Sequence, residues 1–191
     1  MKKELSIFLT GLILFSAIPV FADETSDLKG GKLLIKDKIN PDTKATETQL
    51  VFLIKAKPEK VWTTLIDYDH YTEFMPLKEV KVKSKHGSYD IVFFKPETPM
   101  GFDTSYELKR SYFKDQWKIT FEKYSGKIKS INGYWKLEPM GNNTKATYVS
   151  NIDIGMPVPG FVKDYFTKGG LNKLGEWIKK RVESNGKWKR S

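Results

Sequence analysis

The stretch from residue 157 to residue 182, PVPGFVKDYFTKGGLNKLGEWIKKRV, constrains the fold more than any other part of the chain. Its apolar residues recur at intervals of three and four, which predicts an amphipathic helix with one apolar stripe. No other stretch predicts a helix of this length. Its expected partner is the face of a curved sheet. The stripe consists of Phe161, Val162, Tyr165, Phe166, Leu171, Leu174, Trp177, Ile178 and Val182.

The chain before this stretch consists mainly of short apolar or alternating segments separated by turn signals. Thr48–Lys55 is β-branched and apolar, and six further segments between residues 77 and 153 alternate with a period of two, so these stretches predict strands. Lys32–Ile39 predicts a short edge strand. Pro58 opens a short helix and Asp67–Phe74 forms a second. We therefore expect an α+β fold, in which an antiparallel sheet of about seven strands curves around one long C-terminal helix.

Composition excludes several kinds of site. The chain has 191 residues, which suits a single domain, and it contains no cysteine, so disulfides, thiolate metal sites and cysteine nucleophiles are excluded. Asp67, Asp69 and His70 are too few for a metal site and fit a helix end followed by a helix cap. No motif for a serine nucleophile, a phosphate loop or a dinucleotide site occurs. We therefore expect no catalytic residues, no metal and no cofactor.

The N-terminus has the pattern of a secretory signal peptide. Lys2 and Lys3 form a basic start, Leu5–Val20 is apolar, and Ala22 ends a short segment suited to cleavage. Residues 1–22 are thus predicted to be a signal peptide cleaved after Ala22, and the protein is predicted to be exported, to the periplasm in a bacterium with two membranes. An uncleaved N-terminal anchor is the alternative. Residues 23–31 are polar and predict a frayed entry to the mature chain.

The segment KPEKVWTTLIDYDHYTEFMP, followed by a strand, resembles the opening of the START-like, helix-grip (SRPBCC) superfamily. It is most similar to the polyketide cyclase/coenzyme Q-binding branch, and residues 157–161 (PVPGF) are similar to exported bacterial members. The resemblance covers Gln49 to Val182, so we expect an N-terminal extension at 23–47, a START-like domain at 48–184 and a basic tail at 185–191. The matching positions are Pro58, Glu59, Val61, Trp62, Asp67, Tyr68, Tyr71, Phe74 and Pro76.

The concave face of the predicted sheet is rich in large aromatic residues. From the residues alone, such a face either fills a solid core or lines a cavity. The resemblance implies a mostly apolar ligand pocket between the sheet and the last helix. The candidate ligand-binding residues are Phe74, Phe102, Tyr106, Arg110, Trp117, Phe121, Trp135, Tyr148, Phe166 and Leu174.

Arg110 is the one charged residue among these candidates. If the alternation of its strand holds, its guanidinium points inward, where an unpaired charge is costly, and it needs an acidic side chain or a ligand oxygen. The alternative is a one-residue bulge that returns Arg110 to solvent.

The net charge of +10 makes an anionic partner plausible, although a solvated basic surface is the more common explanation of such a charge. The C-terminal end combines cations with an aromatic residue, which suits an anionic membrane surface. A solvated tail is the alternative. The candidate membrane-surface residues are Lys179, Lys180, Arg181, Lys187, Trp188, Lys189 and Arg190.

Three functions remain open. The leading hypothesis is an exported, monomeric protein that carries or shields a hydrophobic small molecule, such as a lipid or an isoprenoid quinone, and docks on an anionic membrane. The second is an aromatase/cyclase-type enzyme that uses the same pocket, with Tyr106, Arg110 and Tyr148 as its only plausible acid or base groups. The third is a protein-interaction module without a ligand. Export argues against nucleic acid as a partner.

Overall fold

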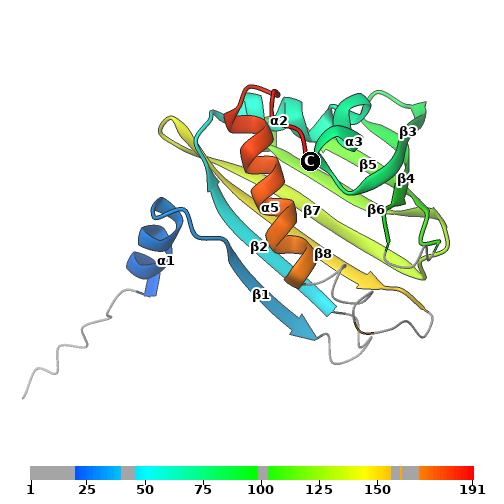
Figure 1. The fold of residues 1–191 in the computed structure, drawn as a ribbon, viewed down its shortest axis with the longest axis horizontal. Coiled ribbons are helices and arrows are strands. Elements are labelled where there is room, and N and C mark those ends of the chain that lie inside the picture. Colours follow the sequence, from blue (N-terminus) through cyan, green and yellow to red (C-terminus); the bar gives the residue numbers. More distant parts are fainter. Residues whose placement is uncertain (1–19, 40–45, 99–102, 156–159, 161–167) are drawn as a thin grey trace, which may run out of the picture.

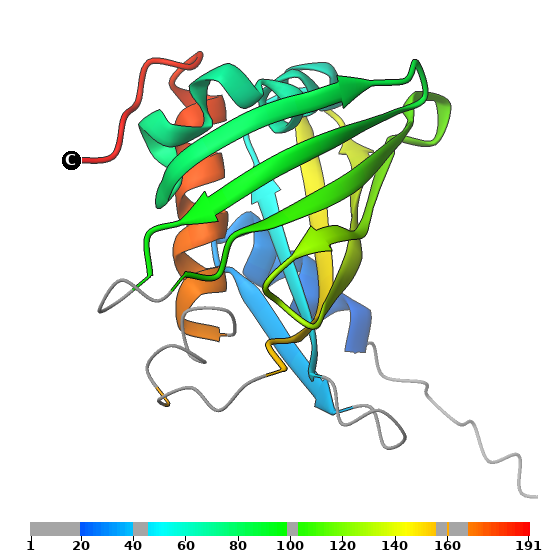
Figure 2. The same cartoon turned by 90° about the vertical axis from the view of Figure 1, so that its right-hand side faces the viewer.

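The computed structural model describes residues 20–39, 46–98, 103–155, 160 and 168–191. Eight antiparallel strands form one sheet in the order β1-β2-β8-β7-β6-β5-β4-β3, and the sheet curves around the helix α5 (Figures 1 and 2). The predicted α+β helix-grip architecture is confirmed. The strand count was slightly low, since the segment after Lys32 does form an edge strand, β1. The strands are β1 Leu34–Ile39, β2 Thr46–Ile54, β3 Leu77–Lys85, β4 Tyr89–Pro96, β5 Tyr106–Phe113, β6 Lys118–Gly126, β7 Ser130–Met140 and β8 Asn143–Asp153.

The helices lie on both faces and at one end of the sheet. Within the described part of the chain, α5 covers the concave face, and the short helices α2 and α3 cover the end of the sheet near the C-terminal end of α5 (Figure 1). Pro58 occupies the first turn of α2, where its missing N–H costs no helical hydrogen bond. The helical segments are α1 Val20–Lys29, α2 Pro58–Ile66, η1 Tyr68–His70, α3 Tyr71–Phe74, η3 Lys114–Gln116 and α5 Lys168–Glu183.

The helix α5 approaches β1 and β2 closely. Leu171, Ile178 and Val182 are buried against the concave face, as the apolar stripe predicted. A Cβ atom at Gly175 would lie 2.3 Å from Cδ2 of Leu33, so the absence of a side chain lets the helix approach the sheet. The part of the predicted helix that precedes Lys168 lies outside the described residues, apart from residue 160.

The prediction of a frayed segment at residues 23–31 was wrong, because most of this segment belongs to the helix α1. Leu28 is only 2% exposed and packs against Val51 and Leu53 on the convex face of β2. The helix is thus stabilised by contacts far away in the sequence, which a local pattern of mostly polar residues does not reveal.

The β6–β7 pair also depends on a residue without a side chain. Gly133 pairs with Phe121 across the two strands, and a Cβ atom at Gly133 would lie 1.9 Å from the carbonyl oxygen of Val149 and 2.6 Å from Cζ of Phe121. The phenyl ring of Phe121 can therefore lie over the backbone of β7 only while position 133 is glycine.

We expect Gly133→Ala to lower the free energy of unfolding by about 3 kcal/mol, the upper end of the range for overpacking, because a backbone carbonyl cannot move aside as a side chain can. Equilibrium urea unfolding measures this loss. Gly87→Ala is the matched control: it meets open space and has a φ of +70°, so it should cost only about 1 kcal/mol of left-handed strain. Equal losses in the two variants would contradict the proposed clash.

Candidate functional site

A cavity of about 110 Å³ lies between α3, the concave face of the sheet and α5. Its wall is almost entirely apolar and aromatic, and its polar atoms belong to tyrosines and one arginine. Such a composition suits a hydrophobic ligand with a small polar part. Among the described residues, the cavity is lined by Tyr71, Phe74, Met75, Leu77, Phe94, Tyr106, Leu108, Arg110, Phe121, Ile131, Trp135, Tyr148, Leu174 and Ile178.

Seven of the ten candidate pocket residues do line this cavity; that they bind a ligand stays a prediction. Trp117 does not line it. It follows η3 in a left-handed conformation, with a φ of 51°, and packs against Trp62 and Lys114 at the α2 end of the sheet. The alternation of its strand therefore begins only at Lys118. Phe102 and Phe166 lie outside the described residues. The seven lining residues are Phe74, Tyr106, Arg110, Phe121, Trp135, Tyr148 and Leu174.

The candidate list omitted half of the wall. Tyr71 stands in the same short segment as Phe74, which was on the list, and Leu108 shares a strand face with Tyr106, so the sequence contained a signal for both. Phe94 and Ile131 also lie on predicted strands, but only the pairing of those strands decides how close they come to the cavity. The residues omitted are Tyr71, Met75, Leu77, Phe94, Leu108, Ile131 and Ile178.

Aromatic rings form the floor of the cavity. The rings of Phe121 and Tyr148 stack with centroids 5.7 Å apart, and the ring of Trp135 lies 4.6 Å from that of Tyr148. Across the sheet, Phe94 stacks on Tyr106 at 5.7 Å. Burial raises the pKa of Tyr148, so its phenol stays protonated at neutral pH and can act as a neutral hydrogen-bonding group.

Arg110 points into this apolar interior, so the inward alternative is the correct one. The β5–β6 pairing does contain an irregularity, between Glu107 and Leu108, but Arg110 stays on the concave face and is only 4% exposed. Its Nη1 donates a long hydrogen bond of 3.4 Å to the hydroxyl of Tyr71, and its guanidinium lies 5.0 Å from the ring centre of Tyr68.

The Arg110 charge has no carboxylate partner among the described residues. Its Nε has no hydrogen-bond partner there either. The nearby carboxylate of Asp90 is used otherwise: Tyr112 donates to Asp90 at 3.0 Å, and Tyr68 therefore donates to Tyr112, at 2.7 Å. Burial raises the pKa of Tyr68 to about 12, which keeps this chain of phenols neutral. Neutral phenols and an aromatic face screen the guanidinium but do not balance its charge.

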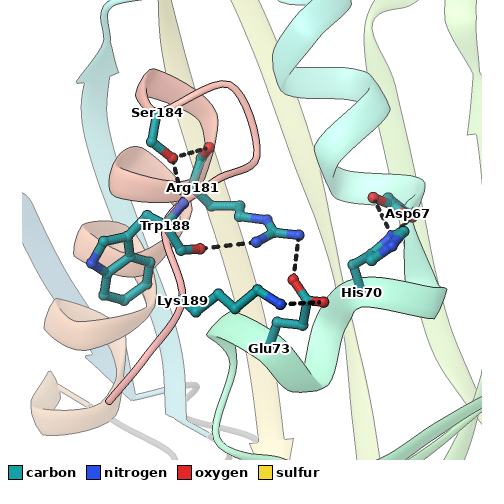
Figure 3. A network of polar contacts seen from close by, with 7 residues as sticks. All are labelled: Asp67, His70, Glu73, Arg181, Ser184, Trp188 and Lys189. Carbon is teal, nitrogen blue, oxygen red and sulfur yellow. Dashed lines mark hydrogen bonds and ion pairs between the residues drawn. The ribbon is translucent and has the colours of Figure 1, made fainter.

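The outer side of α3 is held by the C-terminal end of the chain (Figure 3). Glu73 of α3 accepts from two cations, Nη2 of Arg181 at 2.8 Å and Nζ of Lys189 at 3.0 Å. The backbone N–H of Arg190 donates to the carbonyl oxygen of Glu73 at 2.8 Å, and its guanidinium pairs with Glu97 at 2.6 Å. These contacts place the tail against α3, α5 and the β4–β5 connection.

This arrangement corrects part of the membrane-surface prediction. Arg181 is only 5% exposed, because its guanidinium is enclosed by Glu73, the ring of Phe74 and the carbonyl oxygen of Trp188, so it is not available to a lipid surface. Lys180 and Lys187 remain exposed.

The described residues contain neither a metal cluster nor a membrane-spanning helix. No group of three or more His, Asp and Glu side chains among them could hold a metal ion, and none of their helices is long and apolar enough to cross a bilayer. Nδ1 of the exposed His70 donates to the carboxylate of Asp67 at 2.8 Å, a hydrogen bond that raises the pKa of His70. This pair thus belongs to the end of α2 and the start of η1.

Solved structures with the same arrangement of helices and strands come from distant organisms. Human STARD10 has a TM-score of 0.67 at 13% identity, covering 88% of this chain and 80% of its own. A STAR-related lipid transfer protein from Xanthomonas axonopodis has a TM-score of 0.63 at 14% identity, with 78% and 93% covered. The Zhui aromatase/cyclase from Streptomyces sp. R1128 has a TM-score of 0.51 at 12% identity, with 81% and 90% covered. At these identities the likeness shows a shared fold.

No curated protein matches the sequence as a relative. The model of one family, described as polyketide cyclase / dehydrase and lipid transport, matches residues 54–176, well over half of the chain. The match begins at the end of β2 and ends within α5, so it contains both walls of the cavity. The chain belongs to this family.

Proposed function

We propose that the protein binds a hydrophobic small molecule of the lipid or isoprenoid quinone class in this cavity, with an oxygen-bearing head group at Arg110, and carries or shields it. The observation that supports this proposal is the buried guanidinium of Arg110, which faces an apolar cavity and has no carboxylate partner among the described residues.

We assign a function to Arg110 because burying an unpaired charge lowers the stability of the folded protein. An isolated buried cation is costly, whereas an apolar residue of similar volume would fill the same place at little or no cost. A ligand carboxylate, phosphate or quinone oxygen would accept from the free Nε and offset that cost. The side chains of Tyr71, Tyr106 and Tyr148 line the same cavity and would lie beside such a ligand.

Cyclisation of a polyketone in the same cavity is the second candidate, favoured by the family's description. The described lining offers tyrosines and Arg110 for this chemistry, and neither a phenol whose pKa is raised by burial, such as Tyr148, nor a guanidinium is a good general base at neutral pH. Turnover of a model polyketone that disappears in Tyr106→Phe would support this candidate instead.

Native mass spectrometry of the protein, purified gently from its own host, tests the carrier function directly. We expect a discrete adduct of a few hundred daltons, which is about the mass of a drug-sized or lipid-like ligand. Organic extraction should remove this adduct. A bare mass, together with no binding of a pyrene-labelled fatty acid, would contradict the proposal and would show that the aromatic residues pack a closed core.

Arg110→Met tests the proposed head-group contact. We expect the affinity for a pyrene-labelled fatty acid to fall at least about tenfold, since a hydrogen bond to a charged group contributes about 1.5–3 kcal/mol. The free energy of unfolding should stay the same or rise, because the variant removes an uncompensated buried charge.

Lys109→Met is the matched control, because Lys109 is the next residue of β5 and its side chain pairs with Glu122 outside the cavity. It should leave fatty-acid affinity unchanged. If Arg110→Met bound the fatty acid normally but unfolded easily, Arg110 would be a structural residue and the head-group contact would be refuted.

We further propose that the protein is exported and cleaved after Ala22. The support is the basic start, the apolar stretch and the small residue at position 22. Cleavage there would remove the first three residues of α1 and leave Leu28 in its place against β2. Edman sequencing of the secreted protein should therefore begin at Asp23, and an intact Met1 in the mature protein would show an uncleaved anchor.

A further inference from the structure

The cavity is smaller than the ligands proposed for it. Its volume of about 110 Å³ is below that of the roughly 150 Å³ cavity that accommodates one benzene molecule, whereas pockets for drug-sized ligands have roughly 300–1,000 Å³. A lipid-like ligand can therefore enter only if part of the wall moves. This step rests on the proposed function.

Among the described parts of the wall, the helix α3 is the shortest element. The strands of the sheet are fixed by their hydrogen-bonded ladders, and α5 buries its stripe along the sheet. In contrast, α3 has only four residues, Tyr71–Phe74, of which Tyr71 and Phe74 face the cavity. Met75 and Pro76 then lead directly into β3, so movement of α3 would widen the cavity without breaking a strand.

Two parts of the chain contact α3 from outside: Arg181 of α5 and the C-terminal tail, residues 187–191. Lys189 pairs with the side chain of Glu73 (Figure 3), and the backbone N–H of Arg190 donates to the carbonyl oxygen of Glu73. The guanidinium of Arg190 also pairs with Glu97 and lies over the ring of Trp177 on α5. The tail thus connects α3 to α5 and to the β4–β5 connection, like a strap across the cavity wall.

The strap can be released. The side chain of Lys189 is 64% exposed and that of Arg190 is 30% exposed, and ion pairs at this exposure are weak and screened by salt. The pair between Arg181 and Glu73 is different, since the Arg181 side chain is only 6% exposed. Release of the tail would therefore leave α5 and the Arg181–Glu73 pair in place and would remove only the contacts that Lys189 and Arg190 make with α3.

The charge of this region indicates what could release it. Residues 179–191 carry six cationic side chains and one carboxylate, Glu183, which already accepts from the backbone N–H of Lys55. Lipid phosphates would compete with Glu73 and Glu97 for the same cations, and exposed Lys180 and Lys187 would strengthen the attraction. Trp188 lies half-buried beside Lys180 and is suited to the membrane interface.

We propose that the C-terminal tail is a releasable strap over the α3 wall of the cavity, and that an anionic lipid surface releases it by taking Lys189 and Arg190 from Glu73 and Glu97. Ligand exchange is then fast at an anionic membrane and slow in solution. The cations that close the cavity are the same ones that dock the protein.

Transfer of a pyrene-labelled fatty acid from the loaded protein to acceptor vesicles tests this proposal. We expect transfer to vesicles of phosphatidylcholine with phosphatidylglycerol to be about tenfold faster than to phosphatidylcholine alone, and added salt should remove the difference. Equal rates to the two kinds of vesicle at low salt would overturn the role of the anionic surface.

The double variant Lys189→Ala/Arg190→Ala separates the two functions of the tail. It should transfer fatty acid to phosphatidylcholine vesicles about tenfold faster than the wild type, because the strap is open, and phosphatidylglycerol should add little. Lys145→Ala, which removes the ion pair with Glu138 far from α3, is the matched control and should behave like the wild type. Wild-type rates in the double variant would overturn the strap.

Hydrogen exchange of the unmodified chain gives a readout that needs no ligand. The amide of Arg190, which donates to Glu73, and those of residues 71–74 should exchange faster when phosphatidylglycerol vesicles are added, and phosphatidylcholine vesicles should have no effect. Unchanged protection would refute the strap. If the protein bound no fatty acid but this protection was lost, the ligand proposal would fail while the release of the strap stood.

Discussion

Burial of the apolar face of α5 on the concave face of the sheet is the contact on which the rest of the structure depends. This contact covers the concave face of the sheet, and Gly175 allows the helix to lie close to β1 and β2. Toward α3 the helix presents Leu174 and Ile178 across a remaining gap, which is the cavity. The helix is thus close to the sheet at one edge and separated from it at the other, and the cavity follows from this difference.

Arg110 and Glu73 lie on opposite sides of the cavity wall, and their charges are balanced to different extents. Glu73 lies outside the wall and is shared between Arg181 and Lys189, while its backbone oxygen accepts from Arg190. Arg110 lies inside the wall with neutral phenols around it. The charge of Glu73 is thus balanced by cations outside the wall, whereas the charge of Arg110 inside the wall is not balanced by any described carboxylate.

Much of the fold could be predicted, because periodicity shows directly which face of a strand or helix is apolar. The stripe of α5, the order of the elements and the inward side of β5 all follow from it. Periodicity does not show depth along a sheet or distant partners. Trp117 continued an alternating pattern but stands in a left-handed turn, and Leu28 is buried by a strand more than twenty residues away. The burial of Arg181 was missed for the same reason, since its partner Glu73 is distant in sequence.

The strand β3 forms one end of the sheet and leaves one row of backbone groups without a neighbouring strand among the described residues. Such an edge can recruit a strand from another molecule and start aggregation. Here its pairing with β4 is irregular at two places, and four exposed lysines follow one another along it, Lys78, Lys81, Lys83 and Lys85. A second copy added there in antiparallel or parallel register would bring these lysines side by side. Repulsion between like charges therefore opposes the pairing of this edge with a second molecule, which its backbone groups alone would favour.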